Sequence, residues 1–357
     1  MRGGPPRPYR VVQWATGALG RSAIRAVLER PDMELAGARV YDPAKIGKDA
    51  AVLAGRDPVG VPATGDLSGV LELDADCVIF APQSGIFGID RDAGLETVCE
   101  LLASGLNVVS VVGLVYPPAH GPDLVGELER ACKAGGTTVH GCGVNPGFMA
   151  DLMPVMLSRL SRRISHVYAR ECSDFSGHPS WRMVHRMVGF GKSEEGYLAG
   201  LRVARPTMKA GFAESLHLVA AALGVTLDEI ECDVAYRLAG EDLDIAAGRI
   251  PRGTVAASRW TFNGMVDGQP FVMAEAIYKA DASRIGDWGD PGYSVRVCGR
   301  PSITLTTDED WVTNGIAAAA AHAVNSVPAV CGAEPGIRTY LDLPLVAGRA
   351  APPRRPR

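Results

Sequence analysis

A short stretch near the N-terminus combines residue types and spacings that point to phosphate chemistry. It reads Ala15, Thr16, Gly17, Ala18, Leu19, Gly20. This is the pattern GxGxxG with alanine in the first place, between a predicted strand and a predicted helix. Gly17 leaves room where a pyrophosphate approaches, and Gly20 lets the helix pack closely on the strand. Ala15 can make the tight turn if its φ stays negative. The pattern predicts a dinucleotide site, with the pyrophosphate at the N-terminus of the helix over 21–30.

The end of the second predicted strand carries the residues expected at an adenosine ribose. Asp42 lies about 20 residues beyond the glycine turn, as the dinucleotide pattern requires. Its carboxylate would accept hydrogen bonds from the ribose hydroxyls, which favours NAD. Lys45 and Lys48 follow closely, and a cation there can hold the 2′-phosphate of NADP, although both also read as solvated loop charges. The sequence therefore predicts NAD(P) and leaves the choice open.

Three further strand ends are expected at the same edge of the sheet. Ligands of an open α/β sheet lie outside the carboxyl ends of its strands. We expect Asn145 to bond the amide of the nicotinamide, while the alternative is an Asn-Pro turn that opens the next helix. The residues expected to line the cofactor's path are Ala81 and Pro82 within 81–84, Ser110 and Val111 within 110–113, and Asn145, Pro146 and Gly147.

Four side chains are candidates for moving a proton. Tyr116 and His120 follow the strand over 107–112, where either can donate a proton or be merely solvated. Glu171 and Asp174 stand in or beside an aperiodic polar stretch typical of a binding loop. Either carboxylate can bind a substrate amine, and either can instead cap a strand end or turn.

The polar stretch over 173–196 also contains two histidines. His178 and His185 are seven residues apart and lack a third ligand at metal spacing, so we predict no zinc site. Met183, Met187 and Phe190 are expected in an apolar pocket wall or in the core.

Strands and helices alternate through the first part of the chain. Strands separated by helices of this length form a parallel sheet with right-handed crossovers. The first domain is therefore predicted to be α/β, a Rossmann-type doubly wound parallel sheet. Its strands are expected over 10–15, 33–42, 75–82, 107–112 and 137–143, and its helices over 21–30, 94–105 and 123–136.

The pattern changes after residue 148. Helices are expected over 149–163 and 211–225, and a strand over 164–172. Two long strand-like runs flank Asp267-Gly268, a hairpin signal, and predict a second α+β domain built on a largely antiparallel sheet. A helix over 310–327 is expected to return to the first domain. The predicted divisions are a disordered leader (1–9), a dinucleotide-binding domain (10–147), a substrate and dimerisation domain (148–307), a C-terminal segment (308–345) and a disordered tail (346–357).

Composition excludes several classes of protein. The net charge of −4 over 357 residues argues against nucleic-acid binding. No apolar run reaches the roughly 18 residues that span a bilayer, and the N-terminus lacks the apolar region of a secretory signal. The eight cysteines lack zinc-site and redox spacings, which predicts reduced thiols and a cytoplasmic location.

Several stretches resemble one group of oxidoreductases. Residues 11–50 resemble the N-terminal domain of dihydrodipicolinate-reductase-like proteins. A closer resemblance, to the branch of 2,4-diaminopentanoate dehydrogenase and the native amine dehydrogenases, is carried by HGCGVNPGFMADLMP (140–154), GFG (189–191) and HAVNSVPAVCGAEPGIRTYLDLP (322–344). The resemblance runs from about residue 10 to 345. The His-His and Lys stretch of the reductases proper is absent, which argues against a role in lysine biosynthesis.

The resemblance implies an NAD(P)-dependent oxidoreductase and hydride transfer to or from a carbon that bears nitrogen. It also implies a homodimer formed through the sheet of the second domain. One departure affects the chemistry. The family's glutamate after the strand over 107–112 is missing, and no carboxylate occurs between Ser110 and His120, with Gly113 near the expected place.

Three functions therefore remain open from the sequence. The first is an amine dehydrogenase-like enzyme that interconverts an amine with its imine or ketone plus ammonia. The second is a carbonyl or imine reductase that does not use free ammonia. The third is a non-catalytic dinucleotide sensor, which the missing glutamate brings into consideration. The small-molecule partner is accordingly an amine or a carbonyl compound.

Overall fold

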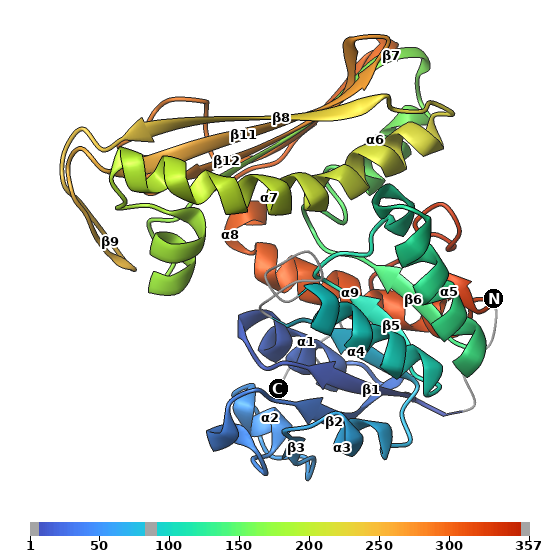
Figure 1. Cartoon of the computed structure of the whole chain (residues 1–357). Helices are drawn as coiled ribbons and strands as arrows, with labels where there is room; N and C mark the ends of the chain where they lie inside the picture. The colour runs from blue at the N-terminus through green and yellow to red at the C-terminus, as the bar shows by residue number, and fades with distance from the viewer. Residues whose placement is uncertain (1–6, 83–90, 351–357) are drawn as a thin grey trace, which may run out of the picture. The chain divides into compact units, whose positions relative to one another are not determined.

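The computed structural model describes residues 7–82 and 91–350 (Figure 1). The chain divides into two compact units. The first unit comprises residues 1–144 together with 316–357, and the second comprises residues 145–315. No helix among the described residues is both long and apolar enough to cross a membrane.

The first unit is built on a seven-stranded sheet in which every pair of neighbouring strands is parallel. This confirms the predicted doubly wound parallel sheet. From one edge to the other, its strands are β15 (Gly336–Ile337), β6 (Thr138–Gly141), β5 (Asn107–Ser110), β4 (Cys77–Phe80), β1 (Tyr9–Trp14), β2 (Met33–Arg39) and β3 (Ala63–Thr64).

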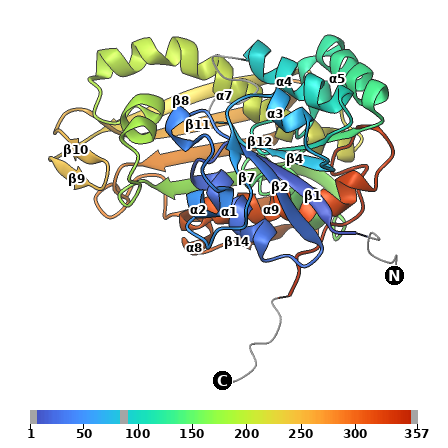
Figure 2. The same cartoon turned by 90° about the horizontal axis from the view of Figure 1, so that it is seen from below.

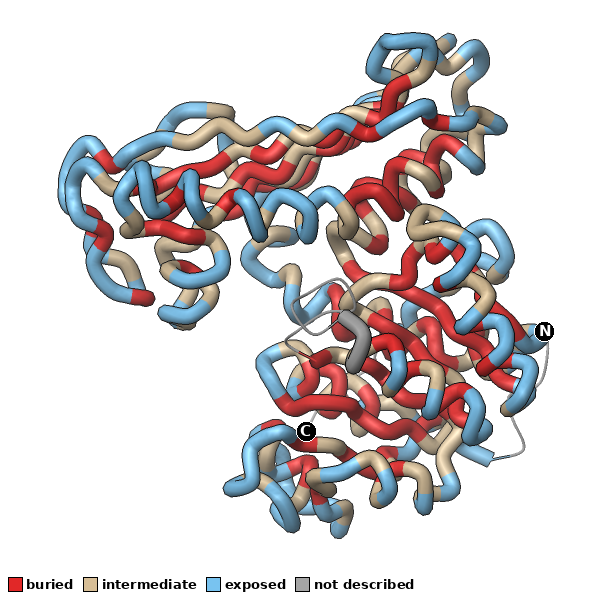
Figure 3. The backbone as a smooth tube through the Cα atoms, in the orientation of Figure 1, coloured by how far each residue is buried: buried red, intermediate tan, exposed pale blue. Residues whose placement is uncertain are grey.

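Helices cover both faces of this sheet, and the strands carry many buried residues (Figure 1, Figure 3). Apolar side chains of the strands belong to two core clusters, one on each face. Helices α1 (Ala18–Leu28) and α9 (Gly315–Cys331) pack with Cys77 and Ile79 of β4. Helices α4 (Arg91–Ala103) and α5 (Pro122–Gly135) pack with Val78 and Phe80. Strand β4 is therefore apolar on both sides, as a central parallel strand must be. The short helices of the unit are η1 (Pro43–Lys45), α2 (Ala50–Leu53), α3 (Ser68–Leu71) and η2 (Pro117–His120).

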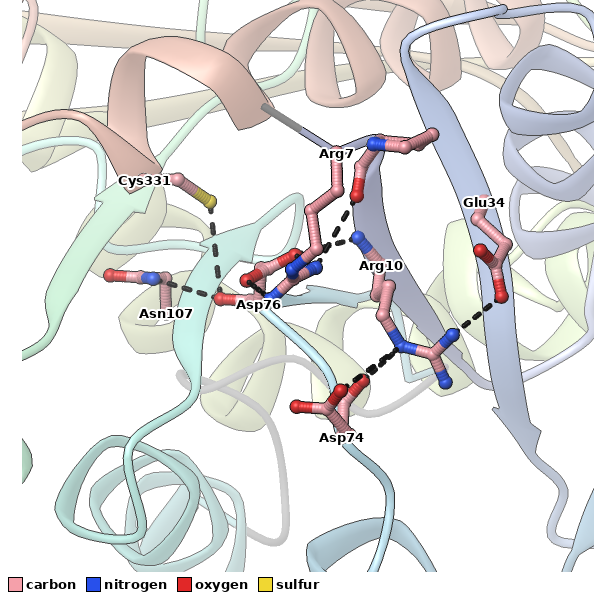
Figure 4. Close-up of polar contacts among 8 residues, drawn as sticks. Arg7, Arg10, Glu34, Asp74, Asp76, Asn107 and Cys331 are labelled. Carbon is pink, nitrogen blue, oxygen red and sulfur yellow. Dashed lines mark hydrogen bonds and ion pairs between the residues drawn. The ribbon is translucent and has the colours of Figure 1, made fainter. Parts of the chain in front are cut away.

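Asp76 joins several elements at the amino ends of the strands (Figure 4). Its carboxylate accepts hydrogen bonds from the Arg7 guanidinium at 2.8 and 2.9 Å and from the Arg10 amide at 2.7 Å. Its carbonyl oxygen accepts one from Asn107 Nδ2 at 2.8 Å and lies 3.9 Å from Cys331 Sγ. These contacts tie β1, β4, β5 and the end of α9 together at the edge opposite the glycine turn.

The second unit is built on a six-stranded mixed sheet. Only the central pair, β7 and β12, is parallel, and the other pairs are antiparallel, which confirms a largely antiparallel sheet. In spatial order the strands are β14 (Ile303–Thr306), β13 (Gly292–Arg300), β7 (Arg162–Asp174), β12 (Gln269–Lys279), β11 (Val255–Val266) and β8 (Glu229–Leu238). The remaining elements are the hairpin β9 (Leu243–Ile245) and β10 (Gly248–Ile250), and the helices α6 (Leu152–Ser158), η3 (Arg182–Val188), α7 (Glu194–Ala222) and α8 (Asp310–Thr313).

Helix α7 runs along one face of this sheet in both views (Figure 1, Figure 2). The ring of Phe212 stacks on Phe262 of β11 with centroids 4.4 Å apart. The predicted hairpin at Asp267-Gly268 is confirmed, because β11 and β12 pair across it. Both turn residues have positive φ, 50° and 70°, as a two-residue turn of type I′ requires.

Three predicted helices of the second part differ in extent. The helix expected over 149–163 is only α6, since Arg162 already pairs with β13 at the start of β7. The helix expected over 211–225 begins at Glu194, where the Ser193 side chain accepts a hydrogen bond from the Gly196 amide. The helix expected over 310–327 is interrupted at Asn314, which separates α8 from α9.

Candidate functional site

The glycine turn leaves the start of α1 open to an anion. Gly17 is the N-cap residue, is exposed, and provides no side chain to bind the first amides of the helix. A Cβ placed on Gly17 would meet no atom within 4 Å. The free amides at a helix N-terminus and the helix dipole both favour negative charge. The space at Gly17 and the uncapped turn over 18–20 therefore fit the pyrophosphate of a dinucleotide.

Close packing explains the other small residues of the turn. A Cβ on Gly20 would lie 2.0 Å from the Ala15 carbonyl oxygen, so only glycine fits there. The buried Gln13 side chain holds the turn in place, since its Nε2 donates to Trp14 O at 2.9 Å and to Ala15 O at 3.1 Å. Thr16 is buried beside them. Gln13 was not predicted, although a polar residue inside an otherwise apolar strand is a detectable signal.

The expected backbone conformation of Ala15 was wrong. Its φ is +72°, in the left-handed region that glycine adopts without strain. For an L-residue this conformation costs roughly 1–2 kcal/mol. The Ala15 amide donates to Arg39 O at 2.9 Å and its carbonyl accepts from Gln13, so both of its peptide groups are held by neighbours. Alanine therefore takes the conformation that the absent first glycine of the pattern would take.

The end of β2 carries an arginine that was not predicted. The Arg39 guanidinium carbon lies 3.5 Å from the centroid of the Tyr41 ring and 5.0 Å from that of Trp14. Trp14 Nε1 donates to Tyr41 Oη at 3.1 Å, which fixes the two rings relative to each other. Arg39 Nε and Nη1 are buried and have no hydrogen-bond partner among the described residues. The signal was an arginine at a strand end, with one aromatic residue two positions further along the chain and another at the end of the neighbouring strand.

Asp42 caps the short helix that follows this strand. Its Oδ1 accepts a hydrogen bond from the Ala44 amide at 3.0 Å, which makes it the N-cap of η1. One carboxylate oxygen is therefore engaged locally. Lys45 ends η1 and is partly buried, while Lys48 is exposed.

The ends of β4, β5 and β6 meet at the carboxyl edge of the first sheet. The Ala81 amide donates to Trp14 O at 3.2 Å, and the Val111 amide donates to Phe80 O at 3.1 Å. Ser110 is fully buried, and its carbonyl accepts from the Cys142 amide at 2.8 Å. Pro82 is buried as well, whereas predicted residues 83 and 84 lie outside the described part of the chain. The described residues are thus brought to the edge that carries the glycine turn.

Tyr116 and His120 flank one short helix in the first unit. Tyr116 is the N-cap residue of η2 and His120 is its last residue. Burial, and secondarily the charge of Asp342, raise the pKa of the Tyr116 phenol above its usual value. Tyr116 therefore keeps its proton at neutral pH.

In the second unit, a carboxylate is held at both oxygens. Glu171 of β7 accepts a hydrogen bond from Asn145 Nδ2 at 2.7 Å and one from Ser173 Oγ at 2.6 Å. Burial raises the pKa of Glu171, and the hydrogen bonds from Ser173 and Asn145 partly oppose that shift. A carboxyl group whose pKa is raised by burial is a candidate for proton exchange with a substrate. Ser173 was not predicted, because its contact with Glu171 depends on local side-chain geometry.

Two tyrosines face this carboxylate from neighbouring strands. Tyr293 of β13 lies opposite Glu171 in the register, and Tyr278 of β12 lies opposite Ser173. Burial, followed by the charge of Glu171, raises the pKa of both phenols. Phe175 packs edge-on against Tyr278 with centroids 5.6 Å apart. Aromatic surface therefore surrounds the carboxylate on its side of the sheet.

Asp174 serves a turn in the structure. Its Oδ1 accepts hydrogen bonds from the amides of Ser176 and Ala282, at 3.0 and 3.2 Å. Its Oδ2 accepts one from Ser176 Oγ at 2.8 Å. Of the two open interpretations of Asp174, the geometry favours the capping role. Glu171 is accordingly the stronger candidate for proton transfer.

The turn over 145–147 also opens the next helix. The Gly147 amide donates to the buried Asp151 carboxylate at 2.7 Å, and Pro146 links it to Asn145. The backbone of Asn145 leads toward α6, as the turn interpretation expects, and its side chain contacts Glu171. The bond to the nicotinamide amide stays a prediction.

The two histidines of the polar stretch contact backbone groups. His185 Nδ1 lies 3.0 Å from Phe190 O, and His185 Nε2 lies 3.3 Å from Ala247 O. His178 Nδ1 accepts from the Ser180 amide at 3.2 Å. Within residues 7–82 and 91–350, no group of three or more His, Cys, Asp or Glu side chains is arranged to hold a metal ion. Phe190 and Val184 are buried there, whereas Met187 is exposed.

Comparisons with known proteins agree with this architecture. The family model of the 2,4-diaminopentanoate dehydrogenase C-terminal domain matches residues 148–353, and that of the dihydrodipicolinate reductase N-terminus matches residues 11–84. An amine dehydrogenase of Streptomyces virginiae is 31% identical over 351 residues, which covers 94% of this chain and 96% of the relative. A 2,4-diaminopentanoate dehydrogenase of Acetoanaerobium sticklandii is 25% identical and covers 94% and 93%.

A solved structure shares the fold. An amine dehydrogenase from Mycobacterium smegmatis superposes with a TM-score of 0.79 at 22% identity, over 96% of this chain and 97% of its own. The family inferred from the sequence is confirmed by the match to residues 148–353 and by the relative that is similar over nearly its full length. The chain belongs to the 2,4-diaminopentanoate dehydrogenase and amine dehydrogenase family, with an N-terminal domain of the dihydrodipicolinate reductase type.

Proposed function

We propose that the protein is an NAD(P)-dependent oxidoreductase that acts on a CH–NH2 group and interconverts an amine with its imine, and by hydrolysis with a ketone plus ammonia. Family membership supports the class of enzyme. The observation that carries the amine chemistry is Glu171, a carboxylate with a raised pKa, held by Asn145 and Ser173 among aromatic rings.

The first unit would hold the cofactor. Gly17, Gly20 and the uncapped start of α1 would bind the pyrophosphate, and Ala18 and Leu19 would present their amides to it. The residues at the ends of β4 and β5, including Ser110 and Val111, would line the path of the dinucleotide. When bound, the nicotinamide ring supplies the acceptor or donor of the hydride.

The second unit would handle the proton on nitrogen. In the direction of deamination, Glu171 pairs with the substrate ammonium and takes one of its protons, which leaves a neutral amine with a lone pair on nitrogen. In the opposite direction the carboxylic acid returns that proton to nitrogen. Burial raises the Glu171 pKa above its usual value, which makes the carboxylate a stronger proton acceptor.

Glu171 thereby takes the place of the family glutamate that is missing near Gly113. The stretch after β5 contains no carboxylate before His120, so a base on that loop is not available from this sequence. Asp174 ranks behind Glu171, because both of its oxygens accept hydrogen bonds from the turn it caps.

We further propose that the cofactor is NADP(H) in preference to NAD(H). Arg39 has two buried nitrogens without a partner among the described residues, and its planar cation is held against two aromatic rings. An arginine at the end of the second strand is well suited to bind a 2′-phosphate, which accepts hydrogen bonds from its fork of donors. One carboxylate oxygen of Asp42 already accepts a hydrogen bond from the Ala44 amide, which leaves Asp42 less capacity to bind the ribose hydroxyls.

A homodimer through the second sheet is also proposed. On the face turned away from α7, exposed Glu231 and Asp233 stand on β8 at one side and exposed Arg296 on β13 at the other. A two-fold axis through that face would bring opposite charges together. Light scattering of Asp233→Arg, alone and combined with Arg296→Asp, tests this: the single variant should weaken the dimer and the double variant should restore it.

The test of the function is NADPH oxidation with a panel of ketones, with and without ammonium. We expect turnover that requires ammonium and that gives the amine. Ammonium-independent turnover would identify a carbonyl reductase instead. Tight NADPH binding without any turnover across the panel would favour a sensor.

A further inference from the structure

The orientation of the Asn145 amide is set by its partner. An ionised carboxylate only accepts hydrogen bonds, so the amide must turn its Nδ2 toward Glu171. The 2.7 Å contact between Nδ2 and Glu171 Oε2 meets that requirement. With Glu171 ionised, this orientation of the amide is the one that makes the bond, and Oδ1 is the atom on the other side.

Asn145 Oδ1 is buried and has no hydrogen-bond partner among the described residues. A buried acceptor without a donor destabilises the folded protein, so such atoms are rare unless a ligand or water completes them. The Ser173 hydroxyl, which also contacts Glu171, already donates its proton to Glu171 Oε1 at 2.6 Å. No donor among the described residues therefore reaches Oδ1, and a molecule bound there would supply one.

We propose that Asn145 Oδ1 accepts an N–H of the substrate nitrogen, so that this site recognises a primary ammonium or iminium group and disfavours a carbonyl oxygen. The inference rests on the proposed function and assigns the residue that distinguishes its nitrogen substrate from the corresponding ketone.

The hydrogen-bonding capacity of Glu171, Asn145 and Ser173 favours a nitrogen substrate over a ketone. Glu171 and Asn145 Oδ1 are both acceptors, and the Ser173 proton and one N–H of Asn145 are already donated to Glu171. A primary ammonium brings three N–H donors and a positive charge, and can bond to both acceptors at once. A ketone oxygen has only lone pairs. It would face the lone pairs of Asn145 Oδ1, with no hydrogen between the two oxygens. In the direction of amination, the species that fits is the iminium formed from ketone and ammonia.

The first experiment compares Asn145→Leu, which keeps the approximate size of the side chain, with Ser173→Ala as its matched control. Both variants remove one hydrogen bond to Glu171, but only the first removes the buried acceptor Oδ1. We expect Asn145→Leu to raise the KM for ammonium roughly tenfold to a hundredfold, the effect of losing a bond from a charged donor. The KM for the ketone and the Kd for NADPH should change about twofold or less, and Ser173→Ala should affect the ammonium KM much less.

The second experiment uses the unaltered enzyme with NADPH bound, so that it does not depend on how a variant folds. Cyclohexylamine and cyclohexanol, which differ in the nitrogen or oxygen, are compared as inhibitors by titration calorimetry. The amine should bind at least tenfold more tightly. Equal binding would overturn the assignment.

The outcomes separate the inference from the function beneath it. If Asn145→Leu weakens NADPH binding and leaves the ammonium KM unchanged, Oδ1 serves the nicotinamide amide and the inference is wrong, while amine chemistry stands. If Asn145→Leu and Ser173→Ala raise the ammonium KM equally, Asn145 only positions Glu171 and the inference is again wrong. If the unaltered enzyme turns over ketones without ammonium, the proposed function itself fails.

Discussion

Gly20 and Ala15 approach so closely that a single added carbon on Gly20 would lie 2.0 Å from the Ala15 carbonyl oxygen. Real side chains do not come that near, so the start of α1 would have to move away from the end of β1. We expect Gly20→Ala to destabilise the protein by about 1–3 kcal/mol, the usual range for overpacking. Urea unfolding measures this change, and an unaltered midpoint with an unaltered slope would contradict the close approach.

Gly17→Asp should leave the stability of the protein nearly unchanged but abolish cofactor binding. A Cβ at this position meets no atom within 4 Å and φ is −68°, so the variant should fold with near-normal stability. Aspartate is itself a favourable N-cap residue. Its charge and bulk would nonetheless occupy the place of the pyrophosphate, so NADPH binding should be lost. Fluorescence titration checks this, with the melting temperature as a control for folding. Unchanged affinity would show that the dinucleotide does not bind at this turn.

Cofactor preference should depend on Arg39. Arg39→Ala is expected to lower kcat/KM for NADPH by tenfold or more relative to NADH, since a charge-assisted bond to phosphate contributes about 1.5–3 kcal/mol. Asp42→Ala should shift the preference toward NADPH by removing a like charge, and Lys45→Ala should shift it more weakly toward NADH. The ratio of the two kcat/KM values is the measurement. If all three variants keep the ratio of the unaltered enzyme, the ribose does not bind at the end of β2.

Glu171→Gln keeps the shape of the side chain and removes its basic form. We expect kcat to fall roughly a hundredfold or more with NADPH binding intact, as for a lost general base. Asp174→Asn is the matched control, because it alters a neighbouring carboxylate that caps a turn, and it should retain most of its kcat. Equal losses in the two variants would remove the distinction drawn between these residues.

The pH profile gives an independent check on Glu171. Burial raises its pKa, so the carboxylate is lost by protonation at a higher pH than for an ordinary glutamate. Amine oxidation should therefore decline on the acid side through a limb displaced toward neutrality. Ser173→Ala removes a hydrogen bond that lowers this pKa, so the limb should move to still higher pH. A limb that moves to lower pH in this variant would contradict the geometry.

A buried histidine makes the stability of the first unit depend on pH. His140 of β6 is 1% exposed, and burial lowers its pKa from 6.5 to about 4. Because this folded pKa lies below the unfolded one, the unfolded chain binds the extra proton first, and stability falls as pH drops from about 6.5 toward 4. The full loss is on the order of 3 kcal/mol. Urea unfolding at pH 7.5 and 5 should show the decline, and His140→Gln should remove most of it.

The parts of the molecule that are local in sequence were predictable. Gly17, Gly20 and the apolar run of β4 each determine their structure through neighbours along the chain, and the hairpin at Asp267-Gly268 does the same. Ala15 shows the limit of that reasoning. Its positive φ results from contacts with Gln13 and Arg39, one of which comes from another strand.

The proposed proton-transfer group was predictable only as a set of candidates. Glu171 and Asp174 are three residues apart and have similar surroundings in the sequence. The structure distinguishes them because Asn145, 26 residues away, bonds to one, and Ser176 and Ala282 bond to the other. Which acid is desolvated and which caps a turn depends on contacts between elements, and residue types and spacing do not contain that information.

The contacts of Asp76 have a consequence for how this family can diversify. They lock the amino ends of β1, β4 and β5, together with the last turn of α9, at the edge of the sheet that carries no candidate reactive group. Mutations at the carboxyl edge then affect strands whose amino ends are already held in place by these contacts. A reactive side chain can then be lost from a loop at the carboxyl edge, such as the one after β5, while the first unit stays folded. The role proposed for Glu171 would be one way of replacing it.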